Sequence, residues 1–132
     1  MRRRNGERGA AAVEFALVFP LVIMLLLTVI EFSRLWNIQA TISDGARVAA
    51  RYAAIHARDD DFSVDDAKDQ ATAIPGLFQW SSATVDVVVD CEDGGSATAT
   101  VSVSPGSISE WFSSALGSPI ELTAVGEMPC GG

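Results

Sequence analysis

Residues 8–15, Arg-Gly-Ala-Ala-Ala-Val-Glu-Phe, decide how this chain is built, because a basic N-terminus changes here into an apolar segment. The 16 residues 15–30 carry no charge, and Glu31 ends the run. Counted from Ala10, the apolar span is 21 residues long and is broken only by Glu14. A helix of that length rises about 31 Å, enough to cross the hydrocarbon core of a bilayer. The sequence therefore predicts a membrane helix with one carboxylate near its end.

Charge is divided unevenly between the two sides of this segment. Residues 1–9 contain four arginines and one glutamate, a net charge of +3. Residues 32–132 contain five basic and fourteen acidic groups, a net charge of −9. Positive charge collects on the cytoplasmic side of membrane helices, so we expect a single-pass protein of the cytoplasmic membrane with its N-terminus inside and the rest outside. The acidic outer part argues against nucleic acid as a partner and against binding of anionic lipid through surface charge.

Three interpretations of the apolar segment compete. A secretory signal peptide has an apolar core of about 7–15 residues and a small-x-small cleavage site after it. The run here is longer, and residues 31–36 offer no such site. An uncleaved signal anchor explains the length and the orientation. It leaves Glu14 unexplained, since a carboxylate inside the span costs on the order of 2.5–3.5 kcal/mol, and less near the interface.

Cleavage after Gly9 is the third interpretation, and it gives Glu14 a purpose. It would make Ala10 the new N-terminus, with a free amino group four residues before Glu14 on the same helical face. In an assembly, the carboxylate can pair instead with the terminal amine of a neighbouring subunit, so that two buried opposite charges neutralise each other. Glycine suits position 9, because a peptidase working at the membrane surface must hold the backbone extended and close.

The same residues resemble a known family. Residues 8–15, followed by Ala-Leu-Val-Phe-Pro-Leu at 16–21 and Ile-Glu-Phe-Ser-Arg at 30–34, are similar to the N-terminal signature of TadE-like proteins. These are pseudopilins of the tight-adherence (Flp) pilus secretion system. The resemblance is dense over residues 7–36 and continues more weakly through residues 45–54.

The resemblance implies how the chain is processed and with what it assembles. An aspartyl prepilin peptidase would cut after Gly9, which makes Glu14 the fifth residue of the mature chain. Major pilins of the same system have a Glu-Tyr pair and end soon after the helix. Here Phe15 follows Glu14 and about a hundred residues follow the helix, which favours a minor, pseudopilin-like component. The implied partners are the prepilin peptidase, other pilins and pseudopilins, the inner-membrane assembly platform and a motor ATPase.

Helical periodicity continues beyond the membrane segment. Apolar and small residues recur there at three- and four-residue steps: Phe32, Leu35, Gln39, Ile42, Ala46, Ala49 and Ala53. This spacing predicts a helix from about Ala10 to about Arg58, with Pro20 or Gly45 as places where it could bend. Its alanine-rich stripe fits close contact with the domain's own sheet or with partner helices, and we favour the first. Trp36 reads as an anchor at the membrane interface.

The rest of the chain predicts a small head. Ser63 looks like the N-cap of a short helix that runs to about Ala73. Residues 84–91 and 97–104, joined by the turn 92–95, predict a β-hairpin. A second short helix at 107–116 and a third strand at 120–128 follow. The fold class is therefore α+β, with four expected parts: a basic leader at 1–9, a transmembrane helix at 10–31, a helical stalk at 32–58 and a head with a three-stranded, mostly antiparallel sheet at 59–132.

Two cysteines lie in the part placed outside. An even count in an oxidising compartment favours one intrachain disulfide between Cys91 and Cys130. The alternatives are two free thiols or an intermolecular bond formed by the C-terminal tail. A Cys91–Cys130 bond requires the first and third strands to end at the same edge of the sheet, and so to run parallel to each other.

No catalytic site is evident. His56 is the sole histidine, and it is expected to be an exposed helix residue. Residues 59–61 are three aspartates that could suggest calcium, but they lack the ligand spacing of an EF-hand loop. We expect no metal, cofactor or small-molecule substrate, and a structural protein rather than an enzyme. The leading interpretation is a minor pseudopilin; the alternative is an uncleaved, membrane-anchored interaction domain unrelated to pili.

Overall fold

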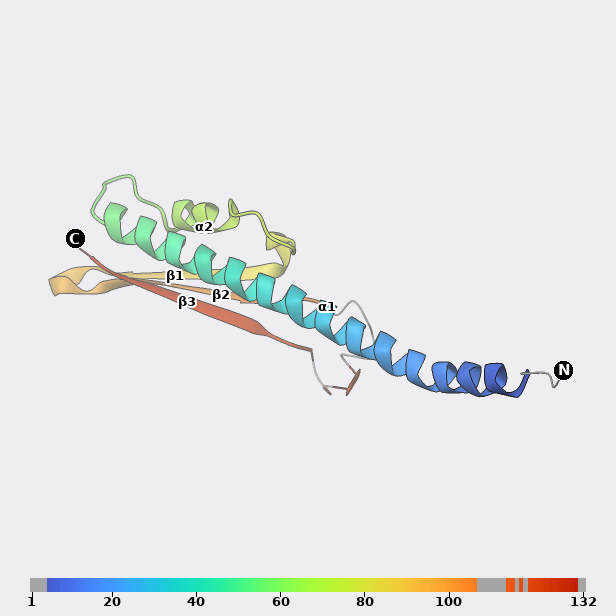
Figure 1. Cartoon of the computed structure of the whole chain (residues 1–132). Coiled ribbons are helices and arrows are strands. Elements are labelled where there is room, and N and C mark those ends of the chain that lie inside the picture. The colour runs from blue at the N-terminus through green and yellow to red at the C-terminus, as the bar shows by residue number, and fades with distance from the viewer. Residues whose placement is uncertain (1–4, 107–113, 116, 118, 131–132) are drawn as a thin grey trace. The chain divides into compact units, whose positions relative to one another are not determined.

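The computed structural model describes residues 5–106, 114–115, 117 and 119–130. The described elements are helix α1 (Asn5–His56), helix α2 (Val64–Thr72) and the strands β1 (Ala83–Asp90), β2 (Ser96–Val103) and β3 (Leu122–Pro129) (Figure 1). Short 3-10 turns at Trp80–Ser82 and Glu92–Gly94 precede β1 and β2. The predicted α+β class is confirmed. The short helix expected at 107–116 falls mostly outside the described residues.

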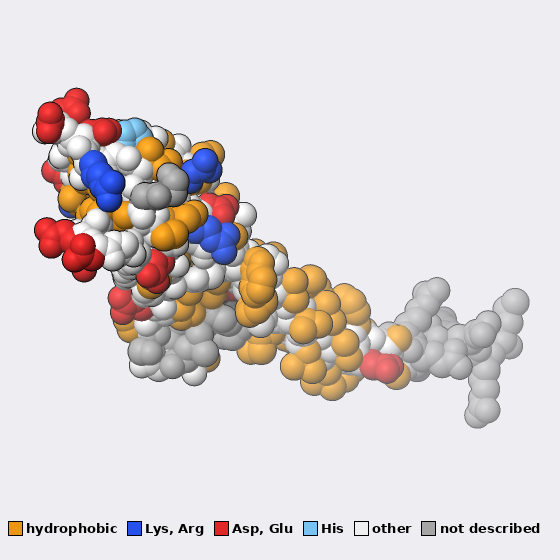
Figure 2. All heavy atoms as spheres, turned by 90° about the vertical axis from the view of Figure 1, so that its left-hand side faces the viewer, with side chains coloured by type: hydrophobic (Ala, Val, Ile, Leu, Met, Phe, Trp, Pro, Cys, Tyr) orange, Lys and Arg blue, Asp and Glu red, His pale blue; other side chains and the backbone are white. Residues whose placement is uncertain are grey.

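The chain divides into two compact units, residues 1–33 and 34–132. In the first unit, α1 is exposed from Gly9 to Ile30, and hydrophobic side chains cover its surface (orange in Figure 2). Among the described residues, α1 is the one helix that is long and apolar enough to cross a membrane. The predicted long apolar helix is therefore present, and its insertion in a membrane over residues 10–31 stays a prediction. Pro20 lies within α1, and the helix continues past both Pro20 and Gly45.

In the second unit, α1 and α2 lie on one side of the sheet (Figure 1). The strands follow the order β1-β2-β3, and both pairings are antiparallel. Hence β1 and β3 run parallel to each other, as the cysteine positions required. The hairpin register places Asp90 opposite Ser96. Gly94, in the turn between them, has φ 84°, a left-handed backbone that favours glycine.

Alanine dominates the contact between the helices and the sheet. One part of the core joins Ile38, Ile42 and Ala46 of α1 to β2 and β3. The other part joins α1 and α2 to β1 and β2, through buried alanines at positions 49, 50, 53, 67, 71, 97 and 99. Small side chains allow the helices to approach the strands closely. This close approach explains why the predicted apolar stripe of α1 consists mainly of alanine. The stripe packs on the domain's own sheet, as we favoured.

The predicted stripe is wrong at Phe32, and it omitted two buried hydrophobic residues of α1. Ala46, Ala49 and Ala53 are fully buried, as expected. Phe32 is 63 % exposed, whereas Ile38 and Ala50, which the predicted spacing omitted, are fully buried. The reason is that the buried face is set by where the sheet lies. Ile38 is within reach of β2 and β3, and Phe32 belongs to the N-terminal unit.

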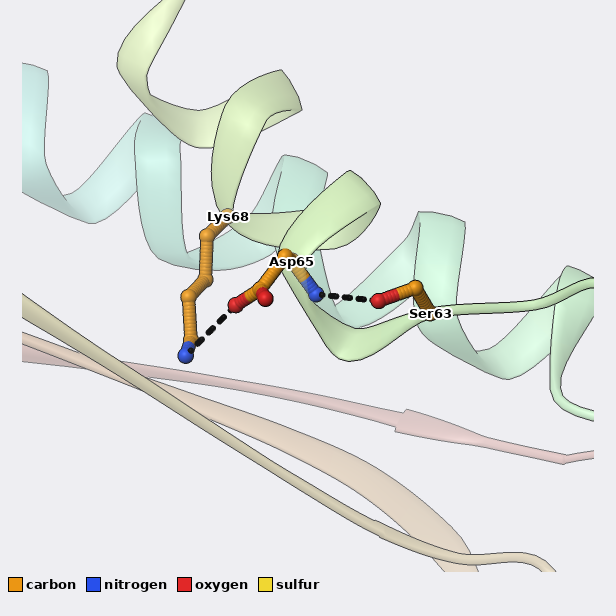
Figure 3. A network of polar contacts seen from close by, with 3 residues as sticks. All are labelled: Ser63, Asp65 and Lys68. Atoms are coloured by element: carbon orange, nitrogen blue, oxygen red, sulfur yellow. Dashed lines mark hydrogen bonds and ion pairs between the residues drawn. The ribbon is translucent and has the colours of Figure 1, made fainter.

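Helix α2 begins with the predicted cap. The Ser63 Oγ accepts a hydrogen bond from the backbone N–H of Asp65 at 3.2 Å, and the Asp66 carboxylate accepts one from the Ser63 N–H at 3.3 Å. Lys68 then pairs with Asp65 at 3.1 Å (Figure 3). This reciprocal capping box satisfies backbone donors at the start of the helix, so local sequence fixes where α2 begins.

Candidate processing and assembly site

Gly9 and Ala10 lie inside α1. The helix was predicted to begin near Ala10, but it begins at Asn5. Both residues are exposed. A Cβ atom at Gly9 would meet no other atom within 4 Å. Glycine costs roughly 0.5–1 kcal/mol relative to alanine in a helix, through its greater loss of backbone freedom. Nothing that the structure describes in this chain's own packing compensates for that cost at position 9.

Glu14 is exposed on α1, one helical turn after Ala10. Within the part of the chain that the structure describes, its carboxylate has no hydrogen-bond or ion-pair partner. Thr28, the other polar side chain between residues 10 and 30, differs in this respect. Its hydroxyl donates to the carbonyl oxygen of Met24 at 2.8 Å, within the same helix. Glu14 is thus the polar group of the apolar segment that its own helix does not satisfy.

The structure pairs Cys91 and Cys130 as a disulfide, with their Cα atoms 5.3 Å apart. Cys91 follows β1 and Cys130 follows β3, at the same end of the sheet. The Cys130 backbone N–H donates to the Gly95 carbonyl at 2.9 Å, which holds the end of β3 beside the hairpin turn. Formation of the bond in the cell stays a prediction.

The predicted site residues fall in separate units. Gly9, Ala10 and Glu14 lie close together along the first turns of the N-terminal unit, whereas Cys91 and Cys130 belong to the head. His56 is half-buried rather than exposed, with its ring stacked on Tyr52 at 4.1 Å between centroids. No group of three metal-ligating side chains comes together among the described residues.

Sequence reasoning missed one feature of the head. A cavity of about 510 Å³ lies between the C-terminal end of α1 and the end of the sheet that carries the cysteines. Arg51, Ile55 and Arg58 line it from the helix, and Met128 and Pro129 line it from β3. The recurrence of the first three at four- and three-residue steps was the available signal, since it places them on one helical face.

Comparison with known proteins identifies a family resemblance in the N-terminal part of the chain. Residues 9–51 match the model of the TadE-like protein family. The match begins at Gly9 and ends within the part of α1 that packs on the sheet. No curated protein matches the chain, and no solved structure does. Residues 9–51 thus confirm the resemblance and identify the chain as carrying a TadE-like N-terminal region.

Proposed function

We propose that this protein is a minor, pseudopilin-like structural component of a tight-adherence (Flp-type) pilus or a related secretion apparatus. A prepilin peptidase removes residues 1–9, and the mature chain begins at Ala10. The TadE-like match over residues 9–51 supports a role related to such pili. The long apolar part of α1 supports a location in the inner membrane, and the arginine-rich N-terminus supports a leader on the cytoplasmic side.

One observation supports this proposal most strongly: Gly9 and Glu14 have no role in the described fold of this chain. The glycine lacks a neighbour that would exclude a side chain, and the carboxylate lacks a partner within the described residues. A residue that costs free energy inside its own molecule is explained when another molecule uses it. The peptidase uses Gly9, and the terminal amine of a neighbouring subunit pairs with Glu14.

Helix α1 constrains how the leader is removed. Since α1 begins at Asn5, the bond between Gly9 and Ala10 lies within its first turns. A peptidase that holds its substrate extended must therefore unwind these turns before it cuts. The glycine favours this step, because it is the residue that least stabilises a helix apart from proline.

Pairing of Glu14 is tested by its replacement. In Glu14→Gln, cleavage after position 9 continues, but the charge that attracts the neighbouring amine is gone. We expect the mature protein to remain in the membrane and to be lost from the assembled complex, measured by co-purification with other pilus components. Glu14→Asp keeps the charge and should retain part of the assembly.

Thr28→Ala is the matched control, because it removes a polar group that α1 already satisfies. It should assemble as the wild type does. If Glu14→Gln assembles equally well, the carboxylate has no role in assembly, and the alternative of a simple anchored interaction domain gains support.

A further inference from the structure

The cavity at the end of α1 has a particular chemistry. Its lining is mostly apolar and includes Ile55, Met128 and Pro129. Two guanidinium groups, those of Arg51 and Arg58, stand along its helix side. Hydrophobic side chains next to blue Lys or Arg side chains are visible on the head in Figure 2. A cavity of this kind fits a small apolar side chain with negative charges on either side of it.

The two arginines are unusual in their setting. The sequence from residue 32 onward has five basic groups against fourteen acidic ones, and this cavity holds two of the five. Arg51 and Arg58 are exposed, and no carboxylate among the described residues lies within ion-pair distance of either one. Ile55 stands between them on the helix and is 62 % exposed. The cavity therefore combines unpaired positive charge with exposed apolar surface in an acidic head.

A complementary pattern lies elsewhere on the same head. Asp86, Val88 and Asp90 alternate along β1, so they point to the face of the sheet opposite the helices. Val88 is 58 % exposed, and neither aspartate has an ion-pair partner among the described residues. No described helix or strand covers this face. Strand β1 thus presents an apolar side chain between two carboxylates.

The two charged residues are separated by similar distances in the cavity pattern (Arg51, Ile55 and Arg58) and in the β1 pattern (Asp86, Val88 and Asp90). Arg51 and Arg58 are two helical turns apart, a rise of about 10 Å. Asp86 and Asp90 are four strand residues apart, a rise of about 13 Å. The long arginine side chains can span the difference of about 3 Å. The central residue of each pattern, Ile55 or Val88, is apolar and exposed.

We propose that the cavity binds β1 of a second copy of this chain, with Val88 entering it and Asp86 and Asp90 pairing with Arg51 and Arg58. The two surfaces belong to different elements of one molecule, so each copy offers one surface to a neighbour on either side. Such a head-to-tail contact closes into a ring or continues as a filament. This contact goes beyond the proposed function, because it requires neither cleavage after Gly9 nor pairing of Glu14.

Photo-cross-linking tests the contact directly. A benzophenone amino acid replaces Ile55 in the full-length protein in detergent, with two isotopically distinct preparations mixed before irradiation. We expect a cross-linked dimer of mixed isotopes, joined to the peptide that contains residues 86–90. Leu77, which is 62 % exposed and belongs to neither pattern, is the control position and should give little dimer. Cross-links from position 55 to another surface, another protein or lipid alone would overturn the proposal.

Charge reversal sharpens the test. One variant carries Arg51→Glu and Arg58→Glu, and the other carries Asp86→Lys and Asp90→Lys. Either variant alone brings like charges together, so the dimer yield should fall at least about tenfold. Mixing the two variants, with the photoprobe on the first, brings opposite charges together again. The cross-link should then return to the peptide around Val88.

The control for charge reversal uses the Asp65–Lys68 pair within α2. Asp65→Lys with Lys68→Glu keeps the net charge and reverses the polarity of an exposed pair outside both patterns. Its dimer yield should equal that of the wild type. If the mixed variants do not regain the cross-link while circular dichroism shows both folded, the second copy is not the occupant and the proposal is wrong.

Discussion

Gly126 of β3 lies directly against the backbone of Ala46 in α1. A Cβ atom at position 126 would lie 2.5 Å from both the carbonyl carbon and the carbonyl oxygen of Ala46. This contact sets how closely the helix approaches the sheet. The alanines of the core are consistent with it, because a larger side chain would separate the two layers.

Gly126→Ala should therefore destabilise the head by about 3 kcal/mol, at the upper end of overpacking costs, because the obstructing atoms belong to the backbone. Gly106→Ala is the control, since a Cβ atom there would meet nothing within 4 Å. Guanidinium unfolding of the full-length protein in detergent, followed by tryptophan fluorescence, measures both. Equal midpoints for the two variants would show that the helix can move away from β3 at no cost.

Gly45 and Trp80 form a second close contact. A Cβ atom at Gly45 would lie 2.7 Å from Cη2 of the indole, and the indole Nε1 donates to the Ile74 carbonyl at 2.6 Å. Gly45→Ala should destabilise the protein by about 1–2 kcal/mol, because it displaces this ring. In a Trp80→Ala background the same change should instead stabilise it by up to about 1 kcal/mol, since alanine favours the helix. A double-mutant cycle measures the change of sign, and destabilisation of equal size in both backgrounds would exclude the ring as the cause.

The cysteine pair closes a long loop. The sequence separation of Cys91 and Cys130 is 39, and restricting a loop of this length in the unfolded chain contributes about 4 kcal/mol on a chain-entropy estimate. Reduction should therefore lower the unfolding midpoint of the wild type and leave that of Cys91→Ser with Cys130→Ser unchanged. A non-reducing gel distinguishes an intrachain from an intermolecular disulfide. An intermolecular bond would give a dimer that a reductant converts to monomer. If the unfolding midpoint of the wild type does not change when reductant is added, the two cysteines are free thiols.

Local signals allowed much of the fold to be predicted. The length of the apolar run identified the first part of α1, alternation of residues identified the hairpin, and Ser63 identified the start of α2. Each of these features depends on residues close in sequence. The pairing of Cys91 with Cys130 also correctly required β1 and β3 to be parallel to each other.

Features that join distant segments were harder to predict. Ile38 is buried because it packs in one cluster with residues of β2 and β3, and the sequence near Ile38 does not indicate that contact. Gly45 looked like a weak interruption of the helix, whereas it makes room for Trp80. The cavity beside Arg51 forms only when α1 lies on the sheet. These features need the tertiary structure.

The N-terminal residue of the mature protein tests the central claim most directly. Intact mass and N-terminal sequencing are measured on membrane-extracted protein from hosts with and without an active prepilin peptidase. Our account predicts a chain that begins at Ala10 in the first host and an uncleaved chain in the second. A chain that retains residues 2–9 despite active peptidase would contradict it, and a cut beyond Ile30 would show that the apolar segment is a secretory signal.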